Sequence, residues 1–76
     1  MNVTIAKVHE NVFAGEALSV SVKTTEGDMT VLPKHESFVA NLVSSVVTVR
    51  TKEGAQNFEI SGGVLEVSND QVTVLL

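Results

Sequence analysis

The sequence predicts an all-β fold: a flattened β-sandwich or barrel of about ten short strands in two sheets, without a helical hairpin. Val, Ile and Thr, whose branched Cβ atoms suit a pleated surface better than a helix, supply 24 of the 76 residues. Gly, Asn and Asp recur between short segments in which apolar and polar residues alternate. No stretch has the 3.6-residue apolar period of a surface helix.

Strands are expected where this alternation has a period of two, because successive side chains of a strand point to opposite faces. The clearest segment is 18–23, where Leu18, Val20 and Val22 alternate with polar residues. Phe58 and Ile60 alternate in the same way. Similar patterns predict strands at 3–8, 11–14, 29–32, 46–51, 64–67 and 72–76. Segment 36–42 fits one helical turn as well as a bent strand, and we interpret it as a short strand entered through an irregular loop.

Turns are expected at the clusters of Gly, Asn and Asp between these segments. Gly15, Gly62 and Gly63 are the predicted structural turn residues, and further turns are expected at 10–11, 26–28, 52–54 and 69–70. A missing Cβ would allow Gly62 and Gly63 to adopt a positive φ, or another backbone to approach closely. No internal repeat is visible in the sequence.

The length of the chain predicts one domain spanning residues 1–76. A chain of this size buries only about 60% of the surface that it exposes when unfolded. Because it has no cysteine, neither disulfides nor thiolate metal sites can supplement the core. It also contains neither an apolar run of about 20 residues nor a leader-like start, so we expect a soluble cytosolic protein.

The charge and the aromatic content of the sequence argue against nucleic-acid binding and against sugar hydrolysis. Nine acidic and five basic residues give a net charge of −4 and are scattered singly, which would repel a nucleic-acid backbone. The chain has no Trp or Tyr on which a sugar could stack, so paired acids such as Glu26 and Asp28 do not indicate a glycosidase.

No pattern in the sequence indicates catalysis. It contains no Gly-x-Ser-x-Gly elbow, no Ser-x-x-Lys pair and no phosphate-binding glycine loop. His35 is of a residue type that often binds metals, but the other histidine, His9, is distant and neither has a ligand at the required spacing. We therefore predict no catalytic residue, no metal site and no cofactor, and interpret His35 as an interface or surface histidine.

Three stretches, 13–16, 26–35 and 61–67, carry a resemblance that covers nearly the whole chain. They read Phe-Ala-Gly-Glu, then Glu-Gly-Asp running into Leu-Pro-Lys-His, then Ser-Gly-Gly-Val-Leu-Glu-Val. In this order and spacing they resemble the N-terminal β domain of the ε subunit of the F-type ATP synthase.

The resemblance implies a non-catalytic rotor subunit of the central stalk, which contacts the γ subunit and the c-ring and so couples ion flow to ATP synthesis or hydrolysis. In that family, the two loops within 26–35 lie at one end of the sandwich and meet the c-ring. The implied candidates for c-ring contact are Glu26, Gly27, Asp28, Pro33, Lys34, His35 and Phe38. Thr30 and Lys34 replace glycines that are usual in the family. The implied location is the cytoplasmic face of the bacterial inner membrane, or its equivalent in an organelle.

The ε family usually follows this domain with a helical hairpin that can inhibit ATP hydrolysis, whereas this sequence stops at Leu76. Either the protein is naturally short or these residues are an isolated domain. The alternative hypothesis is a free-standing β-sandwich that binds a ligand or a protein and has no part in the synthase.

Overall fold

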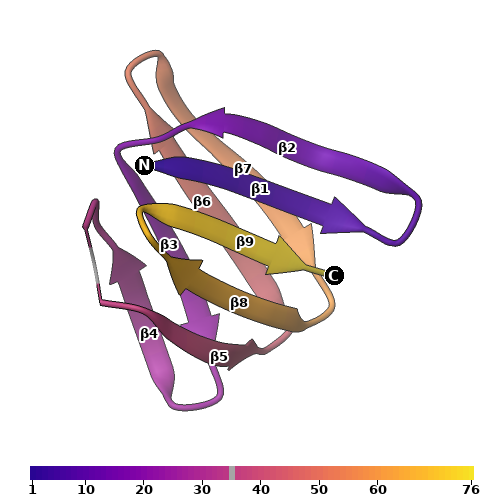
Figure 1. Ribbon diagram of the computed structural model, residues 1–76. Coiled ribbons are helices and arrows are strands. Elements are labelled where there is room, and N and C mark those ends of the chain that lie inside the picture. Colours follow the sequence, from indigo (N-terminus) through magenta and orange to yellow (C-terminus); the bar gives the residue numbers. More distant parts are fainter. Residues whose placement is uncertain (35) are drawn as a thin grey trace.

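The computed structural model describes residues 1–34 and 36–76, and this part of the chain is all-β, as predicted (Figure 1). It contains nine strands and no helix among the described residues. Their bounds are β1 Asn2–Lys7, β2 Glu10–Glu16, β3 Ser19–Thr24, β4 Gly27–Val31, β5 Phe38–Leu42, β6 Ser45–Thr51, β7 Gly54–Ile60, β8 Gly63–Ser68 and β9 Gln71–Leu75. Segment 36–42 thus contributes a strand, not a helical turn.

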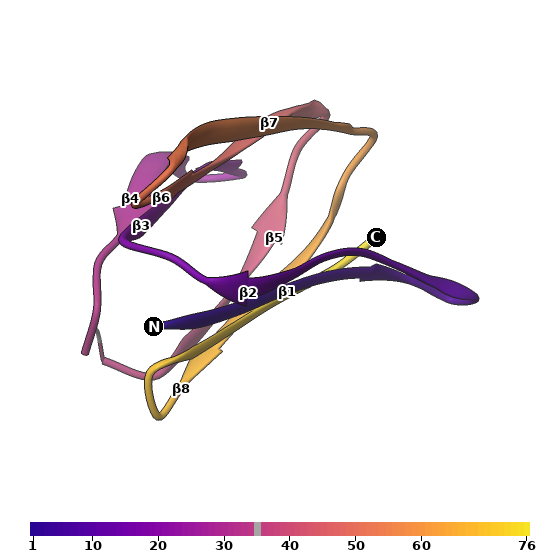
Figure 2. The same ribbon diagram turned by 90° about the horizontal axis from the view of Figure 1, so that it is seen from above.

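The nine strands form one curled sheet, whereas the sequence predicted about ten strands in two sheets. One half has the order β2-β1-β9-β8-β5, and the other contains β4, β3, β6 and β7. The halves join where Leu42 of β5 pairs with Thr24 of β3. Seen from above, they face each other across the interior, so that the single sheet folds over itself like a sandwich (Figure 2).

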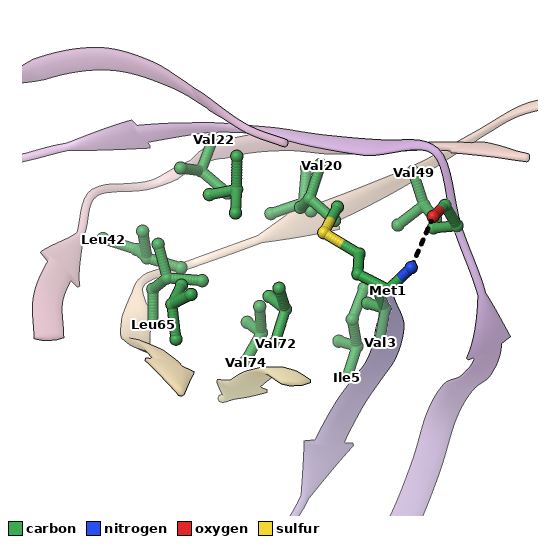
Figure 3. Close-up of a cluster of buried hydrophobic side chains, with 14 of the residues drawn as sticks. Met1, Val3, Ile5, Val20, Val22, Leu42, Val49, Leu65, Val72 and Val74 are labelled. Carbon is green, nitrogen blue, oxygen red and sulfur yellow. Dashed lines mark hydrogen bonds between the residues drawn. The ribbon is translucent and has the colours of Figure 1, made fainter. Parts of the chain in front are cut away.

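The core lies between these halves and is built mainly from valine. The side chains labelled in Figure 3 converge from both halves, with Val20 and Val22 of β3 above Val72 and Val74 of β9. The largest side chains with less than 2% exposure are Ile5, Leu65, Val3, Val20, Val31, Val47, Val49, Val72 and Val74. Leu18, which the alternation placed with Val20 and Val22, is 47% exposed because it precedes β3.

The two end strands of the sheet, β2 and β7, are connected by aromatic side chains. Phe13 of β2 and Phe58 of β7 pack edge to face, with ring centroids 5.7 Å apart and an interplanar angle of 61°. No strand pairing joins β2 to β7 among the described residues. Packing of these rings therefore closes this side of the sandwich.

The half that contains β3, β4, β6 and β7 has an internal repeat that sequence analysis missed. The β3–β4 hairpin reads Val-Ser-Val-Lys-Thr-Thr-Glu-Gly over 20–27, and the β6–β7 hairpin reads Val-Thr-Val-Arg-Thr-Lys-Glu-Gly over 47–54. Their cross-strand side-chain contacts also correspond: Ser21 with Thr30 at 3.3 Å, and Thr48 with Asn57 at 2.9 Å. Because β3 and β6 are antiparallel, the two hairpin turns point in opposite directions.

Several predicted turns lie elsewhere. Gly15 is inside β2 and pairs with Val3, so the prediction of a turn there is wrong. The first hairpin turns at 8–9 rather than 10–11, since Glu10 already pairs with Lys7. Gly62 and Gly63 have φ values of 140° and 152°, which agrees with the positive φ expected of them.

Candidate contact surface at the tip of β3 and β4

The turn that joins β3 to β4 is held by the hydroxyl group of Thr24. This hydroxyl donates a hydrogen bond to the Gly27 carbonyl at 2.9 Å and accepts one from the Glu26 N–H at 3.1 Å. Gly27 has a φ of 122°, a conformation that residues with a Cβ adopt only with strain. Thr24 is 8% exposed, so the hydroxyl acts from a buried position. The turn is therefore well ordered and presents the exposed carboxylates of Glu26 and Asp28 to solvent.

Backbone hydrogen bonds tie this turn to β5. The Thr25 N–H donates to the Asn41 carbonyl at 3.0 Å, and the Val43 N–H donates to the Lys23 carbonyl at 3.1 Å. These bonds flank the pairing of Thr24 with Leu42 that joins the two halves of the sheet. These bonds therefore connect the turn to both halves of the sheet.

An open groove of about 380 Å³ lies between the turn, β4 and β5, and we call it the tip groove. Glu26, Gly27 and Asp28 line it from the turn. Phe38 also lines it and is half-buried against the core. Four of the predicted contact residues are therefore brought together, with two carboxylates next to an apolar wall.

The other predicted contact residues lie elsewhere. Pro33 follows β4, whose five residues carry the chain about 13 Å from the turn at roughly 3.3 Å per residue. It lines a separate pocket of about 350 Å³ together with Met1, Leu18 and Lys52. The Lys34 N–H donates a hydrogen bond of 2.9 Å to Oδ1 of Asp70. Asp70 lies in the turn between β8 and β9. Pro33 therefore does not share the tip groove, and the expectation that both loops lie at one end of the sandwich stays a prediction.

His35 lies outside the described residues, so its place relative to either group of candidates stays a prediction.

Sequence analysis did not identify two of the residues that shape these surfaces. Val39 lines the tip groove and is 66% exposed, because it lies between two strand positions that turn toward the core. Its exposure could have been inferred from the alternation in β5. Asp70 contacts Lys34 across 36 residues of sequence, and no local pattern signals such a contact.

Two further findings concern the described residues. They contain no group of three or more His, Asp or Glu side chains that could hold a metal ion. No helix in this part of the chain is long and apolar enough to cross a membrane.

Relatives of the chain share this β domain. Residues 1–76 match the family "ATP synthase, Delta/Epsilon chain, beta-sandwich domain". The ATP synthase epsilon chain of Corynebacterium jeikeium is 40% identical over 73 residues, which cover 93% of this chain and 59% of that protein. The epsilon chain of Halalkalibacterium halodurans is 36% identical over 75 residues, which cover 99% of this chain and 56% of that protein.

Solved structures agree with these matches. A chain in the cryo-EM structure of the Euglena gracilis mitochondrial ATP synthase has a TM-score of 0.88 and 28% identity, covering 96% of this chain and 48% of that one. A chain in the Tetrahymena thermophila mitochondrial ATP synthase shares the fold, with a TM-score of 0.84 at 16% identity, covering 97% of this chain and 60% of that one. The 76 residues therefore span less than two thirds of the relatives compared here. Since the family match extends over residues 1–76, the chain belongs to the family of β-sandwich domains of ATP synthase delta/epsilon chains.

Proposed function

We propose that this chain is the β domain of a non-catalytic rotor subunit in the central stalk of an F-type ATP synthase. Its role would be to couple ion movement through the c-ring to ATP synthesis or hydrolysis in the catalytic head. The family match over residues 1–76 supports this assignment. So does the similarity to a chain from a Euglena gracilis complex whose description includes F1 and the c-ring.

The observation that carries the proposal is the ordered turn between β3 and β4. A subunit that transmits torque must be a rigid body with one contact surface for each neighbour. The Thr24 hydroxyl orders the turn, and its bonds to β5 connect it to both halves of the sheet. The packing of Phe13 of β2 against Phe58 of β7 adds to this rigidity.

We assign the primary c-ring contact to Glu26, Gly27, Asp28 and Phe38, because these residues share the tip groove. Pro33, Lys34 and His35 remain candidates for a second contact with the membrane sector. Two exposed carboxylates beside an apolar wall suit a polar loop whose donors can reach the carboxylates and whose apolar atoms can cover Phe38.

We assign the γ contact to the outer face of β1, β9 and β8. Leu75 pairs with Ala6 on one side and with Val64 on the other, forming an apolar row across the three strands. Leu75 is 53% exposed and Val64 is 36% exposed. An apolar row on an exposed sheet face is typical of the centre of a protein interface.

The proposed location follows from these contacts. The domain would be peripheral to the membrane, held there through the complex, on the cytoplasmic face of a bacterial inner membrane or its equivalent in an organelle. The epsilon chains compared above come from bacteria, and the solved structures are mitochondrial.

A pair of charge reversals tests the c-ring assignment. Glu26→Lys changes the proposed contact turn, whereas Glu53→Lys changes the corresponding position of the β6–β7 turn, which points in the opposite direction. Each variant would be titrated onto synthase membranes depleted of ε. We expect Glu26→Lys to weaken binding several-fold, and Glu53→Lys to weaken it less, because Glu53 lines the pocket of Pro33, which is a candidate only for the second contact.

Equal binding by both variants would refute the c-ring assignment. A domain that retains neither the γ nor the c subunit in a pull-down would refute the proposed function and favour the free-standing binding module.

A further inference from the structure

Lys34 has a backbone conformation that is unusual for a residue with a side chain. Its φ is 64°, in the left-handed region, where contact between Cβ and the backbone disfavours residues other than Gly, Asn and Asp. It belongs to residues 32–34, which follow β4 and which we call the 32–34 loop. All three of its residues are exposed, so the packing of their own side chains does little to hold this conformation.

The side chain of Asp70 supports this conformation from another part of the molecule. Its Oδ1 accepts a hydrogen bond from the Lys34 N–H at 2.9 Å. A carboxylate is a strong acceptor, so this bond favours the backbone orientation that directs the N–H toward β8 and β9.

The turn that contains Asp70 is itself held in place. Asn69 and Asp70 have φ values of 50° and 61°, which fit the two-residue type I′ turn that matches the twist of a hairpin. The Asp70 carbonyl accepts a hydrogen bond from the Asn2 N–H at 3.0 Å, which fixes the turn to β1.

The carboxylate of Asp70 also faces the chain's first residue. Its Oδ2 lies 3.8 Å from the Met1 ammonium group, which is also 3.3 Å from Glu16 Oε2. The ammonium group donates a hydrogen bond to the Ala17 carbonyl at 3.2 Å, drawn as the dashed line in Figure 3. Met1 is buried at the edge of the core. Asp70 therefore has two potential roles, as an acceptor for Lys34 and as a negative charge near Met1, and a test must separate them.

We propose that Asp70 is the positioning residue of the 32–34 loop, and that it holds this loop in the shape that the domain presents to the membrane sector. The second part rests on the proposed function, because Pro33 and Lys34 are candidates for contact there. Asp70 would act through the Lys34 backbone and would not itself touch the partner.

Three substitutions separate the possible roles of Asp70. Asp70→Asn keeps an acceptor oxygen and tolerates the left-handed conformation but removes the charge. Asp70→Gly also tolerates this conformation but removes the acceptor. Asn69→Gly, at the neighbouring position with the same backbone conformation, is the matched control.

The first readout is hydrogen exchange of the Lys34 amide in the free domain. We expect slow exchange in the wild type, in Asp70→Asn and in Asn69→Gly, and faster exchange in Asp70→Gly. The second readout is binding to membranes of ε-depleted synthase. Losing one hydrogen bond should weaken the binding of Asp70→Gly by about three- to tenfold. Asp70→Asn and Asn69→Gly should bind like the wild type.

The decisive test repeats Asp70→Gly in a variant that already carries Lys34→Gly. Because glycine adopts the φ of 64° without help, Asp70→Gly should weaken binding less in Lys34→Gly than in the wild type. Equal losses in both backgrounds would overturn the proposal, as would Asp70→Asn behaving like Asp70→Gly, which would point to the charge near Met1.

Wild-type amide exchange in Asp70→Gly would also overturn the proposal. Failure of the wild-type domain to bind membranes would refute the proposed function instead, and the exchange measurements would still decide whether Asp70 positions the loop.

Discussion

Replacing Gly63 with alanine should destabilise the domain far more than the same change at other glycines. Gly63 is the first residue of β8 and has a φ of 152°. A Cβ built there would press against the Leu75 carbonyl oxygen, and would lie 3.3 Å from the carbonyl carbon and 3.2 Å from Leu76 Cδ2. The obstacle is backbone of the neighbouring strand β9, which cannot move aside without breaking its pairing with β8.

Gly54→Ala is the matched control. Gly54 is also the first residue of a strand and has a φ of 126°, but a Cβ there would meet nothing within 4 Å. Gly54→Ala therefore introduces the backbone strain of a positive φ without a clash of the new Cβ.

The two variants should lose different amounts of the free energy of unfolding, because only Gly63→Ala introduces a steric clash. A residue forced into an unfavourable backbone region costs about 1–3 kcal/mol, and this applies to both variants. Overpacking adds about 1–3 kcal/mol at Gly63 alone, giving roughly 2–6 kcal/mol in total. A domain of 76 residues has about 4–11 kcal/mol of stability, at about 0.05–0.15 kcal/mol per residue. Gly63→Ala should therefore remove a large part of the free energy of unfolding.

Urea unfolding followed by circular dichroism measures both free energies. We expect Gly63→Ala to have a clearly lower midpoint than Gly54→Ala, which itself lies below the wild type. Equal midpoints for the two variants would show that the close approach of Leu75 does not constrain Gly63, and would refute the reasoning.

Three further predictions concern the core, the tip and regulation. Leu65→Ala, at a fully buried position, should lower the free energy of unfolding by about 2–5 kcal/mol, measured by thermal or urea unfolding. Val64→Ala, on the outer face, should lower it by less than about 1 kcal/mol. Similar losses in the two variants would contradict the assignment of inner and outer faces. Asp28→Lys should change the free energy of unfolding by no more than about 0.5 kcal/mol while weakening membrane binding, and unchanged binding would count against the tip as the c-ring contact. Added to ε-depleted enzyme, the 76-residue domain should leave ATP hydrolysis uninhibited, because the resemblance places inhibition in a helical hairpin outside these residues; strong inhibition would disprove this.

Much of the fold could be predicted because burial follows local alternation. Val20, Val22 and Ile60 are buried as their pattern indicated, since each lies within a strand that has one face on the core. Leu18 departs from the pattern because the strand begins one residue later. At Gly15 the local pattern predicted a turn, because glycine is common in turns. Its pairing with Val3 instead keeps it inside β2.

The contact surface could be predicted less well, because it depends on contacts between distant segments. The grouping of Glu26 and Asp28 with Phe38 arises from the pairing of β3 with both β4 and β5. The separation of Pro33 from this group depends on the direction of β4. The repeated hairpin was in principle readable, but Ser for Thr and Lys for Arg concealed the correspondence between 20–27 and 47–54.

The most direct test of the rotor assignment is ion-driven ATP synthesis in vesicles that contain ε-depleted synthase. Adding the 76-residue domain should restore synthesis. Adding Glu26→Lys at the same concentration should restore less of it, and less than Glu53→Lys restores. A domain that binds the vesicles and yet leaves synthesis at the depleted level would contradict the claim that it couples the c-ring to the catalytic head.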